Sequence, residues 1–325
     1  MIKAQISKRM NRAFILHVGM QKTGTTTLQS LLFPNHEDIY YLGKEVSWSA
    51  TKGCRNADIY RFLSPSIWPD DEASCRVGAG LTHERVFHDI TGSQVLLGSW
   101  EELASRSLNS YLDCIRSLVD RFETCRVMIC LRNPLNLLPS LYLQSLRGRE
   151  SKKSRGLLRG GWYCDIDTWL ERWHDAGGFE GHLAYGDRIR ETIQLLGRDN
   201  VGVFLFEDLC KDQKQFIRAV CRFIGIDDKQ GVSLASQGHL HTRLTQDQVD
   251  FLRRIDHSFW KRIVLSRLSP KRQRELIERF GGSGPPARVE LSETWRERIA
   301  EATRQGNRWL MDSLQLPLDQ YRYPV

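Results

Sequence analysis

A glycine-rich segment near the start of the chain, GMQKTGTTT at residues 19–27, combines one lysine with four threonine hydroxyls. Gly19 and Gly24 let the backbone approach an oxyanion that a Cβ atom would hold away. Inward-facing backbone N–H groups, the N-terminus of a following helix and the Lys22 ammonium would each attract negative charge. The segment therefore predicts a site for a phosphate or a group of similar shape.

A second polar cluster, Arg132-Asn133-Pro134 with Ser140 downstream, follows a short apolar run. The Arg132 guanidinium offers a fork of donors that matches phosphate oxygens. Pro134 can occupy the first position of a helix, and Ser140 on that helix could offer a hydroxyl to the same group. This cluster predicts a second phosphate site.

Four short apolar runs predict strands at residues 14–18, 94–97, 126–131 and 201–206. They alternate with helical patterns, which favours a parallel sheet in an α/β domain. Ligands of such sheets bind beyond the carboxyl ends of the strands. We therefore expect segments 19–26, 98–101 and 132–134 to converge.

The remaining pattern is mostly helical, with little periodicity over residues 35–80 and a mobile basic loop expected at 147–161. The histidine cluster GHLHTR at 238–243 could contact a nucleotide or lie on the surface. Helices are expected at residues 27–33, 56–62, 81–90, 103–122, 167–173, 187–196, 213–223, 245–255, 270–280 and 292–314.

The order of residues in KTGTT excludes a nucleoside-triphosphatase loop, in which lysine directly precedes the final Ser/Thr. KTGTT instead resembles the 5′-phosphosulfate loop of sulfotransferases that use 3′-phosphoadenosine 5′-phosphosulfate (PAPS). The Arg132-Asn133-Pro134 and Ser140 pattern is similar to the 3′-phosphate motif of the same family. The string FLFEDL with the later FIGI is a third similarity, so the resemblance covers residues 14–226.

The resemblance implies an α/β, P-loop-like three-layer fold, with a central parallel sheet flanked by helices and a helical C-terminal extension. It implies a single sulfotransferase domain over residues 1–325, with a core at 12–226 and the extension at 227–325. The implied reaction moves a sulfuryl group from PAPS to a hydroxyl of a small-molecule or glycan acceptor, with an amine as the second choice of acceptor group. A saccharide or glycolipid is the expected acceptor, adenosine 3′,5′-bisphosphate is the product, and no metal is required.

The resemblance assigns catalytic roles to Lys22, which would hold the bridging oxygen of the leaving group, and to Glu101. Glu101 follows a predicted strand in GSWEEL and resembles the acid of an S-S-E segment in bacterial relatives. Its alternative role is to cap the following helix. The implied cofactor-binding residues are Gln21, Lys22, Thr23, Gly24, Thr25, Thr26, Thr27, Arg132 and Ser140.

Other candidates for the base that deprotonates the acceptor are His36, Glu37, His83 and His88, whereas His17 lies within the first strand and is expected in the core. Two other function classes stay open. One is an ATP-dependent kinase of related fold, and the other is a non-catalytic nucleotide-binding protein without a base.

The sequence departs from the family pattern at three places, and two of them, at Thr27 and near the C-terminus, point away from the phenol- and steroid-acting branch and toward bacterial or carbohydrate-acting members. Thr27 stands where a tryptophan often stacks on adenine, and Phe206 stands where a tyrosine is common. The sequence also shows no Gly- and Lys-rich loop near its C-terminus.

The composition is that of a globular protein, with 41% apolar and 26% charged residues and a formal net charge of +8. No apolar run reaches about 18 residues and no signal-peptide pattern occurs, so the cytoplasm is the expected compartment, unless an anchor has been removed. The eight cysteines form no CxxC pair, which predicts neither disulfides nor a structural metal. The positive charge suits anionic ligands, but no nucleic-acid-binding motif accompanies it. The sequence carries no prediction of oligomeric state.

Overall fold

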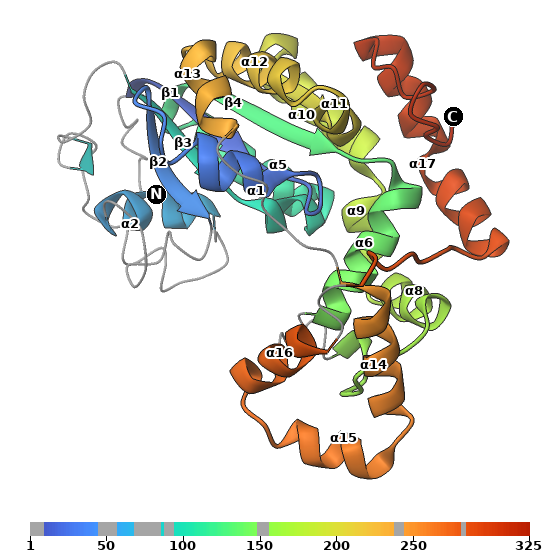
Figure 1. Cartoon of the computed structure of the whole chain (residues 1–325). Coiled ribbons are helices and arrows are strands. Elements are labelled where there is room, and N and C mark those ends of the chain that lie inside the picture. The colour runs from blue at the N-terminus through green and yellow to red at the C-terminus, as the bar shows by residue number, and fades with distance from the viewer. Residues whose placement is uncertain are drawn as a thin grey trace, which may run out of the picture. The chain divides into compact units, whose positions relative to one another are not determined.

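The computed structural model describes residues 10–44, 57–67, 86–87, 94–147, 156–236, 244–280 and 284–325 (Figure 1). The chain forms two compact units, one from Met1–Arg132 with Ala184–His239 and the other from Asn133–Leu183 with Leu240–Val325. The expectation of a single domain stays a prediction.

The first unit is built on a five-stranded sheet in the order β2-β3-β1-β4-β5, and every neighbouring pair is parallel. The strands are β1 (Met10–His17), β2 (Ile39–Lys44), β3 (Val95–Ser99), β4 (Phe122–Leu131) and β5 (Val201–Leu205). The helices are α1 (Thr25–Thr27), η1 (Leu28–Leu32), α2 (Ala57–Ile67), η3 (Glu101–Ser105), α5 (Leu108–Val119), α10 (Tyr185–Leu196), η4 (Arg198–Asn200), α11 (Phe206–Lys211), α12 (Gln213–Ile224) and α13 (Asp228–Ala235).

Helices cover both faces of this sheet because its strands are apolar on both sides. On one face Ile15 and Met128 join a buried cluster with residues of η1 and α12. On the other face, Phe14 stacks on Phe122 at 4.7 Å between ring centroids, and α5 packs against β4. The expected three-layer α/β architecture with a central parallel sheet is confirmed.

The second unit is helical. Its helices are α6 (Pro134–Arg147), α8 (Ile166–Asp175), α9 (Gly178–His182), α14 (Gln246–Asp256), α15 (Phe259–Ser266), α16 (Pro270–Arg279) and α17 (Glu293–Leu314). Stacked Trp169 and Trp173, with centroids 5.7 Å apart, lie on α8, and Tyr142 of α6 meets Trp169 edge-on. The predicted start of a helix at Pro134 and the helical C-terminal segment are confirmed.

Several element boundaries differ from the sequence-based expectation. The edge strand β2 lies in the stretch for which no strand was expected, and the helix expected at 103–122 is divided into η3 and α5. Ser107 causes the division, because its side chain accepts a hydrogen bond from Ser110 N and starts α5 anew. Phe206 begins α11 instead of ending β5. Of the helix expected at 81–90, all but residues 86–87 lies outside the described residues.

Candidate functional site

The glycine-rich loop leaves β1 while still bonded to β4. Met20 N–H donates to the Cys130 carbonyl at 2.8 Å, and Cys130 N–H donates to the Gly19 carbonyl at 2.5 Å. The hydroxyl of the fully buried Thr23 donates to the Met20 carbonyl at 2.6 Å, so it shapes the loop itself. The loop is therefore an extension of the sheet edge with a defined conformation.

Three residues of the loop adopt left-handed backbone conformations: Gly19 at φ 81°, Lys22 at φ 65° and Gly24 at φ 77°. A β-carbon at Gly24 would collide with Leu209 of α11, and it would lie 3.2 Å from the Phe206 ring. Lys22 is the unusual member, because a left-handed conformation costs a non-glycine residue about 1–2 kcal/mol. Such outliers concentrate at ligand-binding sites.

The helix after the loop starts at Thr25, two residues earlier than expected, with Gly24 as its N-cap residue. Thr25 is buried, whereas Gln21, Thr26 and Thr27 are half-buried. The predicted cofactor-binding residues from 21 to 27 thus form one continuous turn at the carboxyl end of β1.

Arg132 lies at the end of β4 and contacts this loop directly. Its Nη1 atom donates to the Lys22 carbonyl at 3.0 Å, and its guanidinium carbon lies 4.6 Å from the centre of the Phe206 ring. Burial leaves only 8% of Arg132 exposed. The guanidinium is therefore held by the backbone conformation of the lysine residue that the sequence singled out.

Glu101, the candidate base, packs against the start of the loop. It is the first residue of η3, and an added β-carbon at Gly19 would lie 3.2 Å from its Cβ and Cγ atoms. The half-buried Glu101 carboxylate also accepts a hydrogen bond at 3.1 Å from Nε2 of Gln29, on η1. The expected convergence of the first two strand ends, together with Arg132, is thus present in the first unit.

Gln29 is a site residue that the sequence analysis missed. Only 4% of it is exposed, and its Oε1 atom is buried with no hydrogen-bond partner among the described residues. The available signal was a polar residue between Leu28 and Ser30 in the helical stretch that follows the loop. Its partner lies 72 residues away in sequence, so the signal alone could not identify the contact.

Buried polar groups lie beneath Glu101 at the same sheet edge. His17 Nδ1 and Ser99 Oγ are 3.0 Å apart, and burial, reinforced by the charge of Lys44, lowers the pKa of His17 to about 3. Burial raises the pKa of Tyr41 and of the Cys130 thiol, and the negative charge of Glu101 adds to both effects. These groups stay uncharged at neutral pH, and the expected core position of His17 is confirmed.

Two rivals for the base, His36 and Glu37, lie at the end of the sheet where the strands begin, just before β2. The glycine-rich loop and Glu101 lie at the other end, where the strands finish. His36 is buried, its Nδ1 accepts from Asp38 N–H at 3.2 Å, and its Nε2 therefore donates to the Asp227 carbonyl at 2.9 Å. Glu37 is exposed beside it. The other two rivals, His83 and His88, lie outside the described residues, as do His239 and His241.

Ser140 lies half-buried on α6, in the second unit, so its pairing with Arg132 stays a prediction. Asn133 caps α6, since its Oδ1 accepts from Leu135 N–H at 2.9 Å. Its Nδ2 atom donates to the carbonyls of Tyr321 and Arg322, at 2.9 and 2.8 Å. Asn133 thus ties the C-terminal segment to the start of α6. Most of the basic loop at 147–161 lies outside the described residues.

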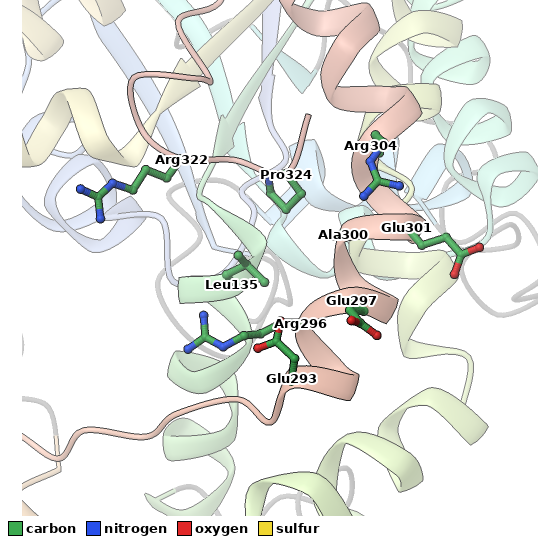
Figure 2. A pocket seen from close by; sticks show the side chains of 9 residues that line it. All are labelled: Leu135, Glu293, Arg296, Glu297, Ala300, Glu301, Arg304, Arg322 and Pro324. Carbon is green, nitrogen blue, oxygen red and sulfur yellow. The ribbon is translucent and has the colours of Figure 1, made fainter.

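A cavity of about 420 Å³ lies in the second unit, lined in part by Leu135 of α6 and Arg322 of the C-terminal segment (Figure 2). Three arginines and three glutamates line it, so its charges balance and select neither anions nor cations. The lining residues are Leu135, Glu293, Arg296, Glu297, Ala300, Glu301, Arg304, Arg322 and Pro324.

Within the described ranges, no group of three or more His, Cys, Asp and Glu side chains could hold a metal ion. The six cysteines found there are free thiols, and Cys54 and Cys75 lie outside. None of the helices in that part of the chain combines the length and apolar character needed to cross a membrane.

A model of the sulfotransferase domain family matches residues 13–248, which include the loop, Glu101, Arg132 and Ser140. The chain belongs to the sulfotransferase family. The expectation drawn from KTGTT and Arg-Asn-Pro is confirmed at this level. Sulfuryl transfer is the chemistry of the family. A search of curated proteins finds no match.

Three solved structures that are similar to this chain at low identity are described as sulfotransferases or sulfotransferase domains. One, from Alicyclobacillus acidocaldarius, is 18% identical, covers 88% of this chain and 100% of its own, and has a TM-score of 0.44. The sulfotransferase domain of the Synechococcus PCC 7002 olefin synthase is 14% identical, with coverage of 91% and 94% and a TM-score of 0.42. Mouse SULT7A1, complexed with PAP, is 13% identical, with 84% coverage of both chains and a TM-score of 0.40.

Proposed function

We propose that the protein transfers a sulfuryl group from PAPS to a hydroxyl group of a saccharide or glycolipid acceptor. The observation that carries this proposal is Glu101, whose Cβ and Cγ atoms lie close to Gly19 of the loop and whose carboxylate accepts a hydrogen bond from Gln29. A carboxylate beside an anion site is costly for binding alone, because like charges repel. Its position is useful when it takes up a proton from a hydroxyl that attacks the bound group. The expected compartment is the cytoplasm.

The residues of the loop fit the phosphosulfate end of PAPS. Gly19 and Gly24 have left-handed conformations, and neighbouring side chains crowd the space that a β-carbon would take. The Lys22 ammonium supplies a full positive charge, and the helix that starts at Thr25 supplies N–H groups of its first turn. We assign the 3′-phosphate to Arg132 and Ser140 on the basis of the family motif.

When bound, PAPS supplies the sulfuryl group, whose sulfur bonds to the acceptor oxygen while its bond to the phosphate oxygen breaks. Lys22 neutralises the negative charge that develops on the leaving phosphate oxygen. Glu101 accepts the hydroxyl proton from the acceptor through its carboxylate. Gln29 holds one carboxylate oxygen of Glu101 and leaves the other for that proton. Lys22 and Glu101 thus promote transfer by placing a positive charge beside the leaving oxygen and a base beside the attacking hydroxyl.

The test measures transfer of radiolabelled sulfate from PAPS to a panel of saccharide and glycolipid acceptors, with ATP and Mg²⁺ as the competing donor system. We expect label on a hydroxyl of an acceptor, and tighter binding of adenosine 3′,5′-bisphosphate than of ATP. Phosphate transfer from ATP, with no preference for adenosine 3′,5′-bisphosphate, would overturn the proposal in favour of a kinase. Tight binding of adenosine 3′,5′-bisphosphate with no transfer to any acceptor would support a binding protein instead.

A further inference from the structure

The helix α15 presents large apolar side chains to solvent. Phe259 is 60% exposed, Trp260 is 75% exposed and Val264 is 59% exposed. Figure 1 shows α15 joining α14 to α16 as the outermost helix of that group. Isolated exposed apolar residues are ordinary, but a contiguous group on one helix marks an interaction surface.

These side chains form one face. At 100° per residue, Phe259, Trp260, Ile263 and Val264 fall within an arc of about 140°. The rings of Phe259 and Trp260 meet edge-on, with centroids 5.7 Å apart. The face is therefore a continuous apolar strip with two aromatic rings at its N-terminal end, and we call these four residues the α15 face.

Cations predominate around the α15 face, although Asp256 precedes α15 and Glu275 of α16 lies 3.9 Å from Lys271. Residues 257–274 contain six Lys and Arg residues, and they contain no Asp or Glu. Lys261, on α15, and Arg267, which caps it, are both exposed. Aromatic and aliphatic residues with a basic surround are the pattern of a helix that lies in the interface of an anionic membrane.

From this complementarity we propose that the α15 face docks on the surface of a membrane that contains anionic lipids. A second copy of the chain fits the face less well, because self-association would bring the cations on and beside α15, such as Lys261 and Arg267, close to the same cations of the other copy. A nucleic acid would use the cations and could stack on Trp260, but it offers nothing to the exposed Val264 and the adjoining Ile263. The headgroup region of a bilayer accepts all of these groups together. The proposal is independent of the sulfuryl-transfer reaction and of the acceptor.

The test is flotation of the full chain with vesicles of phosphatidylcholine and phosphatidylserine, compared with phosphatidylcholine alone. We expect binding to the anionic vesicles that weakens as salt is added. The double substitution Phe259→Ser and Trp260→Ser should weaken binding about tenfold or more, since burial of each ring is lost. Trp260→Phe should retain most of the binding, which separates loss of the surface from loss of the fold.

Charge reversal at Lys261 and Arg267 to Glu should weaken binding by about fivefold or more per residue. The matched control reverses two exposed cations of α12, Lys214→Glu and Arg218→Glu, with the same change in net charge. This control should retain most of the binding. Equal losses in both pairs would overturn the proposal, because the attraction would then depend on net charge alone.

Three other results would also overturn it: equal flotation with both kinds of vesicle, wild-type binding by the serine double variant, or no vesicle binding at all. In the last case, a dimer in sedimentation equilibrium that the serine substitutions dissociate would assign the α15 face to self-association. Binding of single-stranded RNA that requires Trp260 would assign it to nucleic acid.

Discussion

The parallel sheet has an amino edge, where its strands begin, and a carboxyl edge, where they end. The two edges carry similar polar side chains with different hydrogen bonding. At the amino edge, both ring nitrogens of His36 are engaged by backbone groups of Asp38 and Asp227. At the carboxyl edge, Glu101 has one hydrogen-bond partner among the described residues, Gln29, and it faces a loop with left-handed residues. At the amino edge, His36 joins two segments of the chain through its hydrogen bonds. At the carboxyl edge, Glu101 and Gln29 are positioned by one hydrogen bond, and Gln29 Oε1 has no partner among the described residues. Buried polar side chains with unused hydrogen-bonding capacity, more than the types of residue, distinguish the candidate site.

The largest effect that would test this difference is expected at Lys22. Lys22→Ala should lower kcat for sulfate transfer by about 10³- to 10⁵-fold, the range for a cation that stabilises a transferring phosphoryl group. The matched control is Lys229→Ala, an exposed lysine of α13 near the His36 partner Asp227, which should leave transfer unchanged. Steady-state kinetics with labelled PAPS measures both, and near wild-type turnover in the Lys22 variant would rule out its assigned role.

The next effect is expected at Glu101. Glu101→Gln preserves shape but removes the proton acceptor, so kcat should fall by about 10²- to 10⁴-fold. Calorimetry should show unchanged binding of adenosine 3′,5′-bisphosphate. The amino-edge counterpart, Glu37→Gln, should be as active as wild type. If the two glutamine variants were equally active, the proposed contrast between the edges would be lost.

The third effect is expected at His17, the buried histidine of the carboxyl edge, and concerns how the free energy of unfolding depends on pH. The pKa of His17 is lowered to about 3 in the folded protein against 6.5 for the unperturbed group, so the unfolded chain binds the proton more readily. The contribution of neutral His17 to the free energy of unfolding is complete above about pH 6.5. It is lost toward lower pH, at up to ~1.4 kcal/mol per pH unit. Urea unfolding at a series of pH values should show a shallower acid loss for His17→Gln. Identical pH slopes for the two proteins would contradict this account.

The smallest effect concerns Gln29. Gln29→Ala removes the donor that holds Glu101, and kcat should fall by about tenfold while KM for PAPS changes little. The pH profile of kcat should shift as well, which loss of packing alone would not produce. Gln94→Ala is the matched control, because Gln94 donates to the Glu37 carbonyl at 2.8 Å at the amino edge. A loss of activity confined to KM would remove Gln29 from the positioning of the base.

The sequence predicted the strands that have strong apolar runs and the loop that joins β1 to its helix. It missed β2, although the run Ile39–Leu42 followed by Gly43 is as long as the predicted run at 94–97, because β2 lies in the stretch of residues 35–80, which shows little periodicity. Ser107 was likewise hidden inside a helical pattern, since a capping hydrogen bond depends on a local backbone conformation that periodicity does not encode.

Site residues were predictable where the chemistry is local, as in Lys22 and the threonines. Glu101 could be placed at a strand end, but its contact with Gly19 required the sheet order, which brings β3 beside β1. The contact between Gln29 and Glu101 joins segments 72 residues apart, and no local rule announces such a pair. The stacking of Arg132 on Phe206 has the same origin in the fold.

The hydrogen bonds of the loop have an entropic consequence. Met20, Thr23 and the Lys22 carbonyl are fixed by bonds to the Cys130 carbonyl, the Met20 carbonyl and the Arg132 guanidinium, so the loop backbone is ordered before any ligand arrives. Ordering a loop upon binding otherwise subtracts from affinity. Here that conformational cost has been met during folding. Binding at this edge should therefore cost little backbone conformational entropy.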